Sequence, residues 1–299
     1  MNELYDSAQK WLDMIGKPQN YEYPQHVQLI RKFETSEFVG ELYEQANGPG
    51  TVQTTLLMLP KTINGPLPAV VVPFYYPERV AGYHLDTLEP NDEPGIAMAL
   101  HLVRRGYVAV TAEAYHLTYL KLESDRKDTS RWRKSAESLL RDHPEWTGMG
   151  KLITDTQLLV DLLCMDSRVD HDRIGIIGHS LGGKMALYTG CLDSRIKAIL
   201  CSDFGIEWDR TNWLDPWYWG EKLHKLKAAN MDHAELLQVG GLKPFVLIAG
   251  LYDDEQAMDA LKKAGYSDSS PYLFINHASG HHPPMDALER GYDFLQKYI

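Results

Sequence analysis

The chain has 299 residues, of which 44% are hydrophobic and 24% charged, and its formal net charge is −11. This is the composition of a globular protein with enough apolar surface for a large core. The negative charge, without any basic stripe, argues against binding to nucleic acid or to an anionic membrane surface.

The first third of the chain is predicted to form one helix, a hairpin and a buried strand. Apolar residues at helical spacing predict a helix over residues 2–16. Residues 38–44 and 52–59 are predicted strands, and the Asn-Gly-Pro-Gly turn signal at 47–50 predicts that they pair as an antiparallel hairpin. Residues 68–74 form a near-continuous apolar run, which is typical of a strand covered on both faces.

Strands and helices alternate through the rest of the chain. Strands are predicted at 107–111, 173–177, 196–201, 245–249 and 272–275, and helices at 95–105, 152–165, 180–191, 255–264 and 284–298. This alternation predicts an α/β fold whose mostly parallel, eight-stranded sheet carries helices on both faces.

We predict a single domain over residues 1–299, with residues 1–36 as an N-terminal helical extension. Two polar or irregular segments, 114–150 and 203–240, interrupt the alternation, and the second holds four of the seven tryptophans. Segments that follow the carboxyl ends of the strands lie over the active site in open α/β sheets. We therefore expect both segments to be lid-like.

The sequence carries no sign of disulfides or of a membrane segment. Cys164, Cys191 and Cys201 are too sparse for a disulfide framework, and each lies in an apolar run. Residues 1–6 show no signal-peptide pattern, and no apolar run approaches the roughly 18 residues of a membrane span. We expect a cytoplasmic protein, and the sequence leaves its oligomeric state open.

The most informative stretch is the Gly-x-Ser-x-Gly pentapeptide at 178–182, which lies between an apolar strand and a helix. Such a turn strains the serine backbone and requires small residues two positions away, which Gly178 and Gly182 supply. It predicts Ser180 as a nucleophile at a helix N-terminus, where the Leu181 N–H can donate to an oxyanion. The alternative is a glycine-rich turn that only packs closely.

A serine nucleophile needs a base and a group that orients the base. In this strand–turn–helix context the acid precedes the histidine along the chain. His277, His281 and His282 follow the last strands. We rank His281 first, because it follows Gly280 and precedes a proline-initiated helix, then His282 and His277.

The acid is expected just past a strand. Asp253 is the first choice and Asp254 is close behind it, while one of the two is expected to be only an N-cap. Asp203, after the preceding strand, is the outside candidate.

Two further parts of the site are predicted from loops. The second oxyanion donor is assigned to the Tyr75 N–H, because Pro73 has no N–H to donate. Trp208, Trp213 and Trp217 either wall a substrate pocket or pack the second lid-like segment onto the body, and both alternatives stay open.

Residues 169–183 and 193–198 resemble the dienelactone-hydrolase and acetyl-xylan-esterase-like branch of the α/β hydrolases. The early hairpin, residues 105–108 and the Gly-His pair at 280–281 are similar as well. The resemblance implies a Ser–Asp–His triad acting on esters or related acyl compounds without a cofactor or a metal. Dienelactone hydrolases proper have cysteine at the nucleophile position, so Ser180 favours an esterase. The His-Gly pair common after the third strand is absent here.

The predicted function is hydrolysis of a small-molecule acyl ester through an acyl-enzyme, as in a carboxylesterase or carbohydrate esterase. A serine peptidase of the same fold and a hydrolase-fold binding protein that has lost catalysis remain as alternatives. A metalloenzyme using Asp253, Asp254, His281 and His282 is a third, although no metal-binding spacing supports it.

Overall fold

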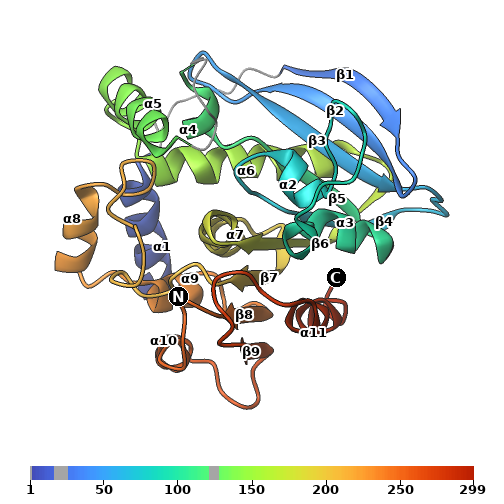
Figure 1. Ribbon diagram of the computed structural model, residues 1–299. Helices are drawn as coiled ribbons and strands as arrows, with labels where there is room; N and C mark the ends of the chain where they lie inside the picture. The colour runs from blue at the N-terminus through green and yellow to red at the C-terminus, as the bar shows by residue number, and fades with distance from the viewer. Residues whose placement is uncertain (1, 17–25, 121–127) are drawn as a thin grey trace.

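The structure is a computed structural model that describes residues 2–16, 26–120 and 128–299. One nine-stranded sheet runs through it in the order β1-β2-β3-β5-β4-β6-β7-β8-β9 (Figure 1). The strands are β1 (Val27–Glu34), β2 (Phe38–Ala46), β3 (Val52–Pro60), β4 (Leu67–Val71), β5 (Val108–Ala112), β6 (Val169–His179), β7 (Ile196–Ser202), β8 (Phe245–Ala249) and β9 (Tyr272–Asn276).

Helices flank this sheet. They are α1 (Asn2–Ile15), α2 (Pro77–Ala81), α3 (Met98–Arg104), α4 (Tyr115–Thr118), α5 (Thr129–Asp142), α6 (Gly148–Met165), α7 (Leu181–Leu192), α8 (Lys222–Ala228), α9 (His233–Val239), α10 (Ala257–Ala264) and α11 (Met285–Leu295), with a short 3-10 turn at Pro94–Ile96. Within the described ranges, no helix combines the length and the apolar character needed to cross a bilayer. The predicted α/β fold is confirmed.

The sheet is antiparallel from β1 through β3 to β5 and parallel from β5 onward. The predicted hairpin is β2–β3, in which Ala46 lies opposite Val52. The ninth strand, beyond the eight predicted, is β1, so among the described residues of the helical extension expected over 1–36, α1 is a helix and Val27–Glu34 is a strand. Pattern analysis misses β1 because it is an edge strand with exposed apolar side chains, Leu29 and Ile30 being 48% and 54% exposed.

Alternate residues of each central strand enter two different cores, as the period of two in a strand requires. In β4, Ala69 and Val71 face the core that α1, α6, α7, α9 and α10 cover. Val70, with Val72 just beyond the strand, faces the core under α2, α3 and α11. Figure 1 shows α1, α9 and α10 on one side of β7 to β9 and α11 on the other. Burial on both faces explains the uninterrupted apolar run of this strand.

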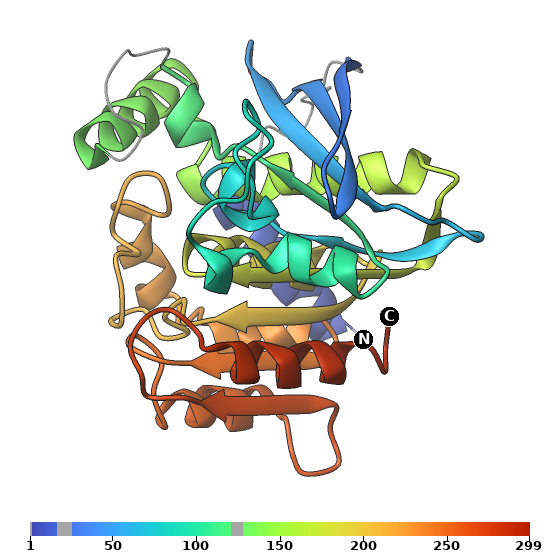
Figure 2. The same ribbon diagram turned by 45° about the vertical axis from the view of Figure 1, so that its right-hand side comes forward.

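The two segments predicted to be lid-like follow β5 and β7. The first contains α4, α5 and the start of α6, with residues 121–127 outside the described residues, and the second contains α8 and α9. In Figure 2 the gold and orange arrowheads of the parallel strands point toward the side where α5 and α8 lie. Helices α5 and α8, one in each segment, therefore lie at the edge where the carboxyl ends of the strands meet.

Helix α1 is attached to the body through Trp11. This side chain is fully buried, and its ring packs edge-on against Tyr188 of α7, with 5.8 Å between centroids, and 6.5 Å from Trp219. Ile15, one turn further, is buried in the same core. Trp11 and Ile15, two of the apolar residues that predicted this helix, are thus the ones that pack against the body.

Removing the Trp11 ring tests this attachment. We expect Trp11→Ala to lower the free energy of unfolding by about 3–5 kcal/mol, because it leaves a large cavity. Leu12→Ala, at a side chain that is 50% exposed, is the matched control and should change it by less than about 0.5 kcal/mol. Urea unfolding measures both variants, and equal small effects would contradict the packing of α1.

Candidate active site

Ser180 occupies a strained turn between β6, which ends at His179, and α7, which begins at Leu181. Its φ of 56° and ψ of −116° lie where non-glycine residues are rarely found. A Cβ on Gly178 would lie 2.0 Å from the Gly182 carbonyl oxygen, and a Cβ on Gly182 would lie 2.1 Å from the Pro73 carbonyl oxygen. The close approach of these backbones requires both glycines, as the pentapeptide predicts.

Two cavities meet at Ser180. The first, of about 310 Å³, and the second, of about 320 Å³, share Tyr75, Ser180 and His281 in their walls. The remaining walls of the first are formed by Phe74, Tyr76, Arg79, Ile96, Trp132, His179 and His282, and those of the second by Lys184, Asp203, Thr211, Asn212, Tyr218 and Tyr252. The serine hydroxyl and the first-ranked histidine therefore face the same space.

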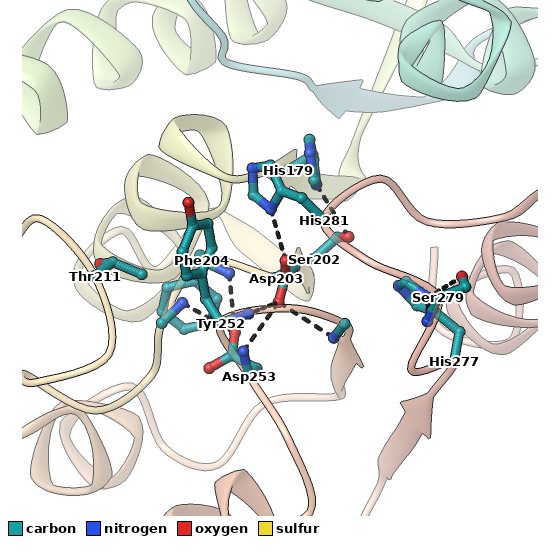
Figure 3. A network of polar contacts seen from close by, with 12 residues as sticks. His179, Ser202, Asp203, Phe204, Thr211, Tyr252, Asp253, His277, Ser279 and His281 are labelled. Atoms are coloured by element: carbon teal, nitrogen blue, oxygen red, sulfur yellow. Dashed lines mark hydrogen bonds and ion pairs between the residues drawn. The ribbon is translucent and has the colours of Figure 1, made fainter.

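His281 is paired with Asp203. Its Nδ1 lies 2.6 Å from Asp203 Oδ2, and the other carboxylate oxygen accepts backbone N–H groups from Gly250, Tyr252 and Asp253 (Figure 3). Burial by itself raises the pKa of Asp203, but the hydrogen bonds from His281 and the backbone outweigh it, so the pKa lies below its usual value. Asp203 is thus a buried, ionised acceptor for the imidazole.

The predicted pair of Asp253 with His281 is not formed, and this corrects the sequence prediction. Asp253 instead accepts the backbone N–H groups of Phe204, Gly205 and Ile206 at 2.9, 3.0 and 2.7 Å (Figure 3). β7 and β8 are neighbours in the sheet, and the loops after them are joined because each carboxylate accepts N–H groups from the other loop. Spacing along the chain cannot show which of the two turns toward the imidazole.

The lower-ranked candidates have other partners. Asp254 accepts the Gln256 N–H and pairs with Arg210, so it shapes the turn before α10. His277 pairs with Ser279 in its own loop, away from Asp203 (Figure 3). His282 lies in the wall of the first cavity.

His179 packs against the rings of His281 and His282, and the sequence prediction did not consider this residue. Its ring centroid is 4.5 Å from that of His281 and 5.4 Å from that of His282, and its Nδ1 lies 3.2 Å from the Ser202 hydroxyl. Burial, and to a lesser extent the two nearby histidines, lowers the pKa of His179 to about 3. It is therefore a neutral packing partner at neutral pH.

The loop after β4 packs against the start of α7, as the contact of Pro73 with Gly182 shows. Tyr75 follows in this loop, and burial raises the pKa of its hydroxyl to about 12. The Leu181 N–H, at the first residue of α7, has no acceptor within its own helix. Both predicted oxyanion donors thus belong to segments that border Ser180.

The three tryptophans singled out from the sequence pack the second lid-like segment onto the body. Trp208 donates to the Met231 carbonyl and buried Trp213 to the Gly205 carbonyl, while buried Trp217 stacks on His116. Of the described residues, those lining the two cavities at Ser180 do not include any of the three. Trp213 packs against Tyr188 of α7 and Trp217 against His116 of α4 and Trp132 of α5, and these are the contacts that the packing alternative expects.

Other side chains take the wall positions. Trp132 of α5 lines the first cavity, and Tyr218 and Lys184 line the second. Lys184 could have been found from the sequence, because it follows Ser180 by one helical turn and residues four apart share a helix face. Among the described residues, no cluster of three or more histidine, cysteine, aspartate and glutamate side chains could hold a metal ion.

Comparison with known proteins supports the resemblance. The model of the Abhydrolase family matches residues 5–211. The protein "Putative hydrolase YtaP" of Bacillus subtilis (strain 168) is 26% identical over 260 residues, which cover 80% of this chain and 81% of that protein.

Two solved structures show the same fold. A glucuronoyl esterase from Teredinibacter turnerae T7901 superposes with a TM-score of 0.71 at 18% identity, covering 99% of this chain and 85% of that one. An acetyl xylan esterase from Paenibacillus sp. R4 gives a TM-score of 0.57 at 17% identity, covering 100% and 93%.

The turn at Ser180 makes a prediction about stability. Gly182→Ala drives a methyl group into the Pro73 carbonyl, so we expect it to lower the free energy of unfolding by about 1–3 kcal/mol or more. Gly95→Ala is the control, because its nearest neighbour would be 3.7 Å away. Thermal and urea unfolding compare the two, and a Gly182→Ala protein as stable as Gly95→Ala would contradict the close approach.

Proposed function

Because the chain belongs to the Abhydrolase family, we propose that it is a serine esterase in which Ser180 is the nucleophile, His281 the general base and Asp203 the orienting carboxylate. The observation that carries the proposal is the His281–Asp203 pair at 2.6 Å, in a cavity wall that also holds the strained Ser180. Asp203 takes the role first assigned to Asp253. The named activities of the structural neighbours favour an ester over a peptide substrate.

Acylation begins when Ser180 Oγ attacks the ester carbonyl carbon. His281 Nε2 takes the hydroxyl proton, and the backbone N–H groups of Leu181 and Tyr75 hold the developing oxyanion. The tetrahedral intermediate collapses, its C–O bond to the alcohol breaks, and His281 returns the proton to the departing alcohol oxygen. The product of this half-reaction is an acyl ester on Ser180.

Deacylation repeats these roles with water. His281 removes a proton from the water, the resulting hydroxide attacks the acyl carbon, and the carboxylic acid leaves as the proton returns to Ser180. Asp203 accepts from Nδ1–H throughout, so the imidazole keeps the correct tautomer and its cationic form is stabilised. The lowered pKa of Asp203 keeps this carboxylate charged at neutral pH.

Loss of the nucleophile is the first test. We expect Ser180→Ala to abolish labelling by a fluorophosphonate probe and to lower kcat for ester substrates by about 10³-fold or more. A panel of nitrophenyl esters, acetylated sugars and aminoacyl anilides then reports the class of acyl compound. Ser279→Ala, in the exposed loop, is the matched control and should be labelled like the wild type. A folded wild type that stays unlabelled and cleaves no member of the panel overturns the proposal.

The choice of acid gives a second test. We expect Asp203→Asn to lower kcat by about 10³–10⁴-fold, because the amide supports the wrong imidazole tautomer. Asp253→Asn should lose much less activity and mainly lower the melting temperature, since its carboxylate holds the loop after β7. Asp254→Asn is the control with unchanged activity. A loss for Asp253→Asn equal to that for Asp203→Asn, in folded proteins, would restore Asp253 as the acid.

A further inference from the structure

Lys184 is a buried cation beside the nucleophile that the proposed chemistry does not use. It lies in α7, one turn after Ser180, and only 2% of its surface is exposed. Its Nζ donates to the Phe204 carbonyl at 2.8 Å and to the Thr211 hydroxyl at 2.7 Å. The same atom lies 4.3 Å from the centroid of the Trp213 ring.

This buried environment is energetically unfavourable for a charged ammonium group. Both hydrogen-bond acceptors are neutral oxygens, and burial lowers the pKa of Lys184 to about 7, against the longer-range attraction of Asp253, Asp215 and Asp203. Methionine would fill a similar volume without the desolvation penalty. A buried cation with a lowered pKa at the wall of an active-site cavity marks a functional position.

Lys184 lines the second cavity, and its Nζ also lies 5.0 Å from the centroid of the Tyr218 ring in the same wall. In its protonated form Lys184 has three N–H donors, and the contacts to Phe204 and Thr211 use two of them, so the third can bind a ligand oxygen in the cavity. The other walls combine polar side chains with three tyrosines, and they are formed by Tyr75, Ser180, Asp203, Thr211, Asn212, Tyr218, Tyr252 and His281. Such a mixture suits a compact group that carries several oxygen atoms.

The charges around this cavity favour an uncharged ligand. Asp203 lies in the wall and is ionised, and Asp215 and Asp253 act on Lys184 from farther away. A carboxylate entering here would be repelled by the ionised Asp203 in the wall. A hydroxyl, ether or carbonyl oxygen accepts from Lys184 without that repulsion.

We propose that the second cavity is a subsite for an uncharged, hydroxyl-bearing part of the ester, and that Lys184 Nζ donates a hydrogen bond to an oxygen atom of that part. Lys184 is then a specificity-determining residue rather than a member of the proton relay. The inference rests on the proposed esterase function, because the subsite matters only if Ser180 is acylated.

The test compares two acetate esters that share an acyl group. 4-Nitrophenyl acetate has no hydroxyl-bearing part, and a monoacetylated methyl xyloside has one. We expect Lys184→Met to lower kcat/KM for the xyloside about 10–100-fold more than for the aryl ester, the loss of a hydrogen bond from a charged donor. The extra loss should be mainly in KM. Lys225→Met, at an exposed lysine of α8, is the control and should leave the ratio of the two kcat/KM values unchanged.

A second variant keeps the test decisive if Lys184→Met does not fold. Thr211→Val keeps the side-chain shape but removes an oxygen that fixes Nζ, so it should shift the same ratio in the same direction by at least about threefold. An unchanged ratio in the folded variants overturns the subsite. A selective loss with 4-nitrophenyl succinate, whose acyl group carries a carboxylate, overturns the assignment of an uncharged ligand.

The two proposals fail in different ways. If the wild type shows no ester hydrolysis that depends on Ser180, the proposed function fails. If the aryl acetate is hydrolysed through Ser180 but the acetylated xyloside is not a substrate, only the subsite fails. The same holds if the ratio of the two kcat/KM values does not change in the Lys184 and Thr211 variants.

Discussion

The site depends on the close backbone approach at the turn between β6 and α7. Gly178 touches Gly182, and Gly182 in turn touches Pro73 in the loop after β4. These contacts hold Ser180 in a conformation that an isolated chain would not adopt, with a positive φ that the surrounding sheet must enforce. They also bring the loop that carries Tyr75 against the start of the helix, so that one packing arrangement positions the proposed nucleophile and the proposed oxyanion donors.

A second constraint joins the loops after β7 and β8. Asp203, in the first loop, accepts N–H groups from the second, and Asp253, in the second loop, accepts N–H groups from the first. This reciprocal arrangement satisfies buried donors and buried carboxylates together, as buried polar groups require. It leaves one oxygen of Asp203 free to bind His281, and so it connects the rigidity of the sheet to the orientation of the imidazole.

The aromatic side chains of residues 208–219 pack against α7, the helix that follows Ser180. Trp213 is buried against Lys184 and Tyr188, and Trp219 links Tyr188 to Trp11 of α1. The N-terminal helix α1, the helix α7 that follows Ser180 and the segment after β7 therefore share one core. This packing encloses Lys184, and the enclosure gives its ammonium group both its desolvation penalty and its value as a donor.

The sequence by itself determined the alternation of strands and helices, the β2–β3 hairpin and the turn at Ser180, because each depends on local periodicity or on glycines a few residues apart. It also ranked His281 above its neighbours, and in the structure Nδ1 of this histidine lies 2.6 Å from a carboxylate oxygen of Asp203. Only the tertiary structure decided the partner of His281, the packing role of Trp208, Trp213 and Trp217, and the strand character of Val27–Glu34. These features depend on which loops and faces meet across the sheet, and neighbours along the chain carry no information about such contacts.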